Sequence, residues 1–166
     1  MRVRPTIAHV LLASALLAAG CSSPGSESVI DTPPTTDLLG LGPPPAVPAL
    51  DPTAVAEGEV LYRQYCASCH GADLAGDPDW MTPNEDGSFR PPPHDSSGHT
   101  WHHPDPLLIE IVRDGGGFPE SRMPGFGERL SDEQVESVLA YLKSSWGPEE
   151  RAHQWRMTWQ DRQLGS

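Results

Sequence analysis

The chain has 166 residues, of which 11 are lysine or arginine and 23 are aspartate or glutamate, giving a formal net charge of −12 at pH 7. Phosphate contacts need lysine and arginine, so this balance argues against nucleic-acid binding and against electrostatic adhesion to anionic lipid. A docking partner with a positive surface would instead be steered toward the chain.

Residues 1–20 have the pattern of a signal peptide. Arg2 and Arg4 precede an almost entirely apolar run over residues 7–19, which is too short to span a bilayer comfortably. Residues 17–21 (LAAGC) resemble a bacterial lipobox, in which Cys21 becomes the lipidated first residue of the mature chain. The alternative is an ordinary secretory signal with Cys21 as a spare thiol. Either interpretation places the domain outside the cytoplasm, on the periplasmic side of a bacterial envelope.

Residues 21–50 are predicted to be a lipid-anchored, disordered tether. Its prolines, which interrupt helix and sheet pairing, are Pro24, Pro33, Pro34, Pro43, Pro44, Pro45 and Pro48. Serine, threonine and glycine fill much of the rest, so the segment has too little apolar surface to offset the cost of ordering. We expect extended, polyproline-like pieces that let an anchored domain reach its partners.

A globular domain is predicted over residues 51–147, and its first helix should run to Tyr65. Asp51 followed by Pro52 is typical of an N-cap with proline at the first helical position. The apolar stripe of this helix consists of Ala54, Val55, Gly58, Leu61, Tyr62 and Tyr65.

The segment after this helix, Cys66-Ala67-Ser68-Cys69-His70, is a C-x-x-C-H pattern typical of covalent c-type haem attachment. Two thiols a helical turn apart can each add to one vinyl group of a haem, and the adjacent histidine then supplies an axial nitrogen to the iron. A zinc site usually shows a second cysteine or histidine pair, and a redox thiol pair sits in a βαβ pattern; neither is evident. The sequence therefore predicts one haem c, held by Cys66, Cys69 and His70.

Residues 77–104 show no convincing helix or strand, and loops of this length are usually functional or disordered. The segment contains Trp80, Arg90, His94, His99, Trp101, His102 and His103. One interpretation is a second metal site, such as copper, built from the histidines. We favour a haem cover, in which Trp101, Arg90 or a histidine hydrogen-bonds the haem propionates, because no cysteine or carboxylate pattern completes a metal site.

A second helix is predicted over Pro106–Asp114, with Asp105 as its cap. The glycines at 115–117 end it. Its apolar residues are Leu107, Leu108, Ile111 and Val112.

A third helix is predicted from Asp132 to Ser144, where Ser131 and Gln134 form a capping box. Its core stripe consists of Val135, Val138, Leu139 and Leu142.

The tail, residues 148–166, should contain a further helix beginning at Pro148. In that helix Ala152, Trp155 and Trp159 share a face, which we expect to pack on its own domain; the alternative is a helix that docks a partner protein.

Met123 is the candidate for the second axial ligand of the iron. It lies in a loop rich in glycine and proline, residues 121–127 (SRMPGFG), rather than on a helical core stripe. A thioether is a soft, neutral ligand, and His/Met ligation raises the reduction potential of c-type haem. The alternative is a histidine from residues 77–104, which would lower the potential.

In this order the motifs resemble a class I monohaem cytochrome c over about residues 52–147. The matching pieces are residues 58–62, 66–71 (CASCHG), 123–126 (MPGF) and 130–142. The resemblance implies an all-α fold, a small helical domain wrapped around one covalently bound haem. It implies that the first and last helices cross near Gly58, Tyr62 and Tyr141. It also implies that a proline carbonyl, of Pro92 or Pro93, accepts the free N–H of axial His70.

The same resemblance implies electron transfer without catalytic residues. Together with the predicted lipid anchor and the negative net charge, it favours a membrane-tethered carrier whose redox partners have a basic docking surface. His70 and Met123 would hold the iron in a similar geometry in both oxidation states, which keeps reorganisation small. One alternative is a haem-containing subunit of an envelope dehydrogenase or oxidase. A haem peroxidase would need an open sixth site, which Met123 would block. A metal-binding module that uses the histidines, with structural haem, is the remaining alternative.

Overall fold

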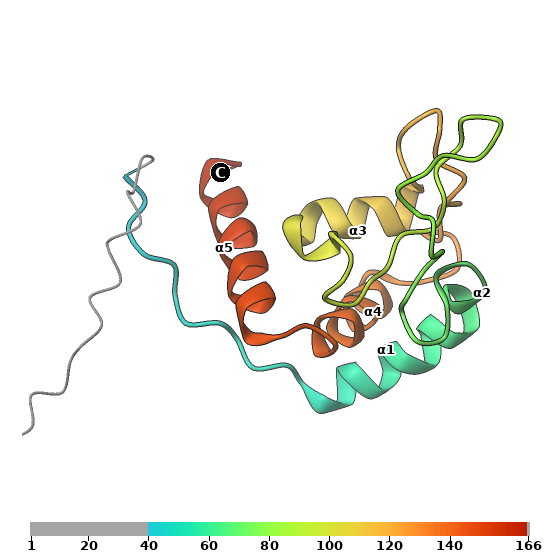
Figure 1. The fold of residues 1–166 in the computed structure, drawn as a ribbon. Coiled ribbons are helices and arrows are strands. Elements are labelled where there is room, and N and C mark those ends of the chain that lie inside the picture. The colour runs from blue at the N-terminus through green and yellow to red at the C-terminus, as the bar shows by residue number, and fades with distance from the viewer. Residues whose placement is uncertain (1–39, 166) are drawn as a thin grey trace, which may run out of the picture. The chain divides into compact units, whose positions relative to one another are not determined.

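The computed structural model describes residues 40–165. The predicted signal peptide, Cys21 and residues 22–39 of the predicted tether therefore lie outside the described residues. Between residues 40 and 165 the chain forms helices and loops and contains no strand, as expected for an all-α fold (Figure 1). No helix in this range is long and apolar enough to cross a bilayer.

The described helices follow the chain in the order shown in Figure 1. They are α1 (Pro52–Tyr65), α2 (Ala67–His70), the 3₁₀ turn η1 (Thr100–His102), α3 (Asp105–Asp114), α4 (Asp132–Ser144) and α5 (Pro148–Leu164).

The ends of α1 and α4 are set by the predicted local signals. The Asp51 carboxylate accepts a hydrogen bond from the Thr53 N–H at 2.9 Å, ahead of Pro52 at the first position of α1. At α4, Ser131 and Gln134 form both bonds of the capping box. All four predicted core residues of α4 are buried, and so are Gly58, Leu61 and Tyr62 of α1.

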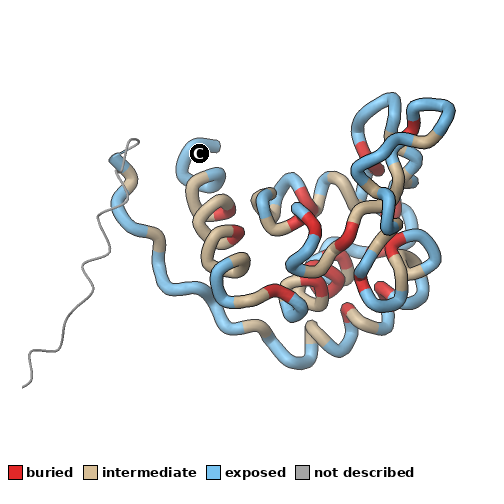
Figure 2. Tube along the Cα trace, viewed as in Figure 1, coloured by how far each residue is buried: buried red, intermediate tan, exposed pale blue. Residues whose placement is uncertain are grey.

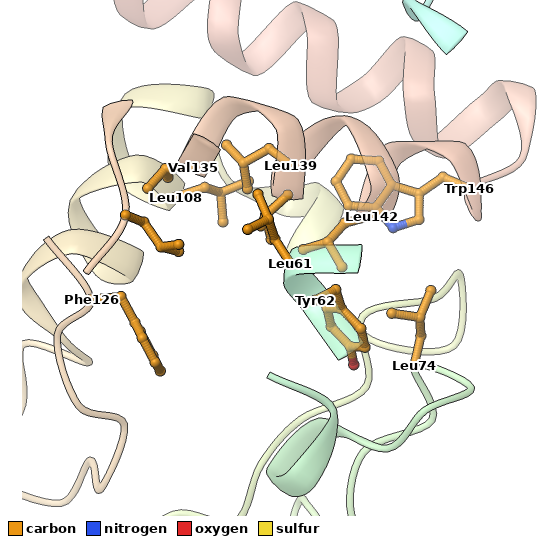
Figure 3. Packing of buried hydrophobic residues seen from close by; sticks show 11 residues of the cluster. Leu61, Tyr62, Leu74, Leu108, Phe126, Val135, Leu139, Leu142 and Trp146 are labelled. Carbon is orange, nitrogen blue, oxygen red and sulfur yellow. The ribbon is translucent and has the colours of Figure 1, made fainter. Parts of the chain in front are cut away.

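The helices α1 and α4 cross at Gly58, as the resemblance implies. A Cβ atom on Gly58 would lie 1.9 Å from the Ser137 carbonyl oxygen and 3.0 Å from the Cβ of Tyr141, so only glycine permits this approach. One turn further along, the rings of Tyr62 and Tyr141 are 5.4 Å apart. Figure 3 shows Leu61 of α1 beside Leu139 and Leu142 of α4 in the core that this crossing creates.

The start of α3 differs from the prediction. The helix begins at Asp105 with Pro104 in the N-cap position, and Asp105 makes no cap. Its carboxylate is instead bound from other elements, by Lys143 Nζ at 2.5 Å and by Gln154 Nε2 at 2.7 Å. The expected stripe of α3 is also only partly correct, because Leu108 is buried whereas Leu107 is 38% exposed.

The predicted tail helix is present as α5, and it packs on its own domain through a polar face. Its two buried residues are Gln154 and Thr158, and the Thr158 hydroxyl accepts the Asp105 N–H at 3.0 Å. The face that contains Trp155 is only half-buried. The contacts between α5 and the loop ahead of α3 therefore combine these hydrogen bonds with the packing of His153 against Trp101 and His102.

The end of the predicted tether, residues 40–50, is extended and mostly exposed (Figure 2). Two of its carbonyl oxygens bind α5: Trp155 Nε1 donates to Pro45 O at 2.8 Å, and Arg151 Nη2 donates to Pro48 O at 2.7 Å. A cavity of about 260 Å³ lies between this segment and α5. Residues 45–48 are thus attached to the helical part of the chain, which the composition alone did not suggest.

Candidate functional site

A single short helix places both thiols and the histidine of the C-x-x-C-H pattern together. Only Cys66 separates the end of α1 from the start of α2, and the N–H groups of Cys69 and His70 both bind the Cys66 carbonyl oxygen, at 3.1 and 3.0 Å. No disulfide joins Cys66 to Cys69; Cys66 is half-buried and Cys69 is exposed. Burial, together with the nearby Cys69, raises the pKa of the Cys66 thiol to about 11, so this thiol stays protonated at neutral pH.

His70 is held in the tautomer that a metal ligand needs. Its Nδ1 lies 3.0 Å from the Pro92 carbonyl oxygen. A carbonyl oxygen only accepts hydrogen bonds, so Nδ1 carries the proton and Nε2 keeps its lone pair. Burial lowers the pKa of His70, which favours this neutral form. Of the two prolines that the sequence left open, the structure selects Pro92.

The backbone behind His70 is fixed by Tyr62 of α1. The Tyr62 hydroxyl donates to the Gly71 carbonyl oxygen at 2.8 Å and lies 3.3 Å from that of His70. Burial raises the pKa of Tyr62, so the hydroxyl keeps its proton and acts as a donor. The Gly76 N–H adds a bond to the His70 carbonyl oxygen at 2.9 Å. The haem motif is therefore connected directly to the α1–α4 crossing.

His94 lies against the ring of His70, a contact that the sequence interpretation missed. The two imidazole rings are stacked, with centroids 4.1 Å apart and planes inclined by 28°. His94 Nδ1 is 2.8 Å from the Thr100 hydroxyl oxygen. Burial, with a further contribution from His70, lowers the pKa of His94 well below its usual range. No sequence signal pointed to this contact, because Pro92 meets His70 through its backbone carbonyl oxygen and the loop has no periodic pattern from which the direction of the His94 side chain follows.

Among the candidate propionate donors, Trp101 has the buried N–H that the described residues leave without an acceptor. Arg90 is already used, since its Nη1 pairs with Asp77 Oδ2 at 3.3 Å and its Nε donates to Thr82 O at 3.0 Å. The Trp101 indole N–H is buried and has no acceptor among the described residues. Buried donors in native proteins are nearly always paired. A haem propionate would supply the missing acceptor, so the site fits a haem in this respect.

The other histidines do not form a metal site within residues 40–165. His99 stacks on Trp80 with ring centroids 5.2 Å apart, and His102 lies against Trp101 and His153. No group of three or more histidine, cysteine, aspartate or glutamate side chains there could hold a metal ion. The second-metal interpretation therefore gains no support. The expectation of no helix in residues 77–104 was also wrong in one place, because η1 forms there.

The loop that contains Met123 is folded back against the end of α3. The Gly116 N–H donates to Met123 O at 3.3 Å, and the Phe126 N–H donates to Val112 O at 2.9 Å. A Cβ atom on Gly125 would lie 2.6 Å from the Arg113 carbonyl oxygen, which explains a glycine at this close approach. Met123 is partly buried against the hydrophobic core, to which the neighbouring Phe126 belongs (Figure 3). The loop thus has a defined backbone path that presents Met123 to the interior.

The family model for cytochrome c matches residues 55–146, more than half of the chain. The chain belongs to the cytochrome c family. Haem c, covalently attached, is the cofactor of this family, and the pair Cys66 and Cys69 fits its C-x-x-C-H motif. The helical structure without strands in the described residues agrees with the fold of a class I cytochrome c, whose activity is electron transfer.

Several curated proteins are similar to this cytochrome. The dihydro-heme d1 dehydrogenase of Pseudomonas aeruginosa is 30% identical over 106 residues, which is 63% of this chain and 18% of that protein. The gluconate 2-dehydrogenase cytochrome c subunit of Pantoea cypripedii is 32% identical over 103 residues, 54% of this chain and 20% of its own length. The cytochrome c subunit of the quinone alcohol dehydrogenase of Gluconacetobacter polyoxogenes is 26% identical over 132 residues, which is 69% of this chain and 22% of that protein. The chain therefore spans about a fifth of these relatives. No solved structure matches it.

Proposed function

We propose that this cytochrome is an electron carrier whose haem c is bound through Cys66 and Cys69, with His70 and Met123 as axial ligands. When bound, the haem supplies a one-electron couple between ferrous and ferric iron. The observation that carries the proposal is the hydrogen bond from His70 Nδ1–H to the Pro92 carbonyl oxygen, because it orients the Nε2 lone pair for a metal.

The remaining residues of the site orient and shield the cofactor. Tyr62 holds the Gly71 carbonyl oxygen and so fixes the backbone that carries His70. The Trp101 indole N–H is available to a propionate oxygen. The partly buried Met123 would complete the coordination with a neutral sulfur. If His70 and Met123 both bind the iron, no coordination position would be left for a substrate, as a carrier rather than an enzyme requires.

The test of haem attachment is the mass of the protein matured in a host with a c-type haem assembly system. We expect one haem adduct on the wild-type chain and none on a Cys66→Ala, Cys69→Ala double variant. A Ser68→Ala variant, altered between the two thiols, should keep the adduct. Unmodified sulfhydryls on the wild-type protein would contradict the proposal.

A second candidate function is a haem subunit of a larger oxidoreductase. It is favoured by the names of the relatives, since two of them are cytochrome c subunits of dehydrogenases. For either function, the excess of acidic over basic residues supports redox partners with a basic docking surface. Affinity purification of the holoprotein from its host at low ionic strength distinguishes the two functions, because a subunit retains a dehydrogenase or oxidase in stoichiometric amount.

We propose further that the protein is exported and anchored at the periplasmic side of the envelope through lipidated Cys21. Support comes from the sequence of residues 1–21 alone. A Cys21→Ser variant should move from the detergent phase to the aqueous phase on detergent partitioning and should lose the acyl mass of its N-terminal peptide. A wild-type chain that partitions into the aqueous phase with an unmodified Cys21 would contradict lipidation.

A further inference from the structure

We propose that His94 is a positioning residue for the axial ligand: its imidazole ring forms a support that fixes the ring plane of His70. The inference rests on the proposed role of His70 as the axial ligand and concerns how that ligand is oriented. Its basis is the stacked contact of the two rings, with centroids 4.1 Å apart and an interplanar angle of 28°.

One hydrogen bond is insufficient to fix an imidazole ring. The bond from His70 Nδ1–H to Pro92 O sets the direction of one ring nitrogen, but coupled rotation about the Cα–Cβ and Cβ–Cγ bonds can still tilt the ring. A second ring packed against the face of His70 opposes that tilt. The contact with His94 therefore constrains the movement that the Pro92 bond leaves free.

His94 can serve as a support because its own backbone and ring are held on several sides. Its N–H donates to Leu74 O at 2.7 Å, and its carbonyl oxygen accepts the Trp146 indole N–H at 2.7 Å. Its ring nitrogen lies 2.8 Å from the Thr100 hydroxyl oxygen, and its ring is edge-on to Tyr62 at 6.4 Å. Tyr62 also binds the backbone behind His70. The two histidine rings thus belong to one packed unit.

Two substitutions separate the aromatic face of His94 from its hydrogen bond. In His94→Phe the stacking face remains and the bond to Thr100 is lost. In His94→Gln the side chain can still hydrogen-bond Thr100, but the ring is gone. His99→Gln is the matched control, because His99 stacks on Trp80 and not on His70.

The measurement is the proton NMR spectrum of the ferric holoprotein, in which the haem-methyl and axial-histidine resonances report the orientation of the axial ring. Thermal unfolding is recorded in parallel. We expect His94→Gln to change the order and spread of these resonances, whereas His94→Phe and His99→Gln stay close to wild type. A merely structural role would lower the unfolding temperature without producing this spectral difference.

A wild-type resonance pattern in haem-loaded His94→Gln overturns the inference alone. Equal displacement in His94→Phe and His94→Gln also overturns it, because the hydrogen bond to Thr100 would then be responsible. Absence of haem from the wild-type protein overturns the proposed function and this inference together. The two failures are therefore distinguishable.

Discussion

Replacing Met123 by alanine should abolish the weak absorption band near the red end of the ferric spectrum and should lower the midpoint potential. The band reports sulfur ligation of the ferric iron, and a Met/His pair gives a higher potential than a site without the thioether. Met123 is partly buried in a loop fastened to the end of α3, so its sulfur is close to the core in which the haem is expected. The absorption spectrum and a redox titration of the purified holoprotein measure both effects.

Met81→Ala is the matched control, because Met81 is 80% exposed and lies in the long loop ahead of Pro92. We expect its spectrum and potential to equal those of the wild type. An unchanged band in Met123→Ala would exclude Met123 and would point to the sulfur of another methionine, whereas a wild-type protein without the band would leave a histidine as the candidate. Conversely, loss of the band in Met81→Ala would identify Met81 as the ligand.

Replacing Gly58 by alanine should destabilise the holoprotein by about 3 kcal/mol, the upper part of the usual range for overpacked cores. The new Cβ atom would lie 1.9 Å from the Ser137 carbonyl oxygen, which is backbone, so α1 and α4 must move apart. Alanine has a higher helix propensity than glycine by about 1 kcal/mol, so propensity alone predicts the opposite sign. The free energy of unfolding, measured by denaturant titration, decides between destabilisation by overpacking and stabilisation by helix propensity.

Val60→Ala provides the control on the same helix. Val60 is 64% exposed, so we expect its free energy of unfolding to stay within about 0.5 kcal/mol of wild type. A Gly58→Ala variant as stable as wild type would show that the crossing adapts easily and that Gly58 is not required there.

The parts of the fold that the sequence predicted well are those with local causes. The boundaries of α1 and α4 follow from Asp51, Ser131 and Gln134, whose capping bonds join residues two or three apart. The stripe of α4 follows from helical periodicity. In the site, the C-x-x-C-H run needs no tertiary information, because its spacing is itself the signal for haem attachment.

The parts that were missed depend on contacts between distant segments. Asp105 has the sequence of a cap, but Lys143 and Gln154 bind its carboxylate from α4 and α5. The choice of Pro92 over Pro93 and the stacking of His94 on His70 depend on the path of a long loop that has no periodic pattern. The packing of α5 through Gln154 and Thr158 was missed for another reason. Hydrophobic periodicity detects only apolar faces, and this buried face is polar.

Tyr62 connects the α1–α4 crossing to the backbone that follows His70, two parts of the protein that would otherwise respond separately to denaturant. Its ring packs beside Tyr141 where α1 meets α4, and its hydroxyl binds the carbonyl oxygen that follows His70. A loosening between the two helices is therefore transmitted to the axial ligand through one rigid side chain. The colour of the bound cofactor should consequently register early loss of tertiary packing, at denaturant concentrations where the helical circular dichroism is still intact.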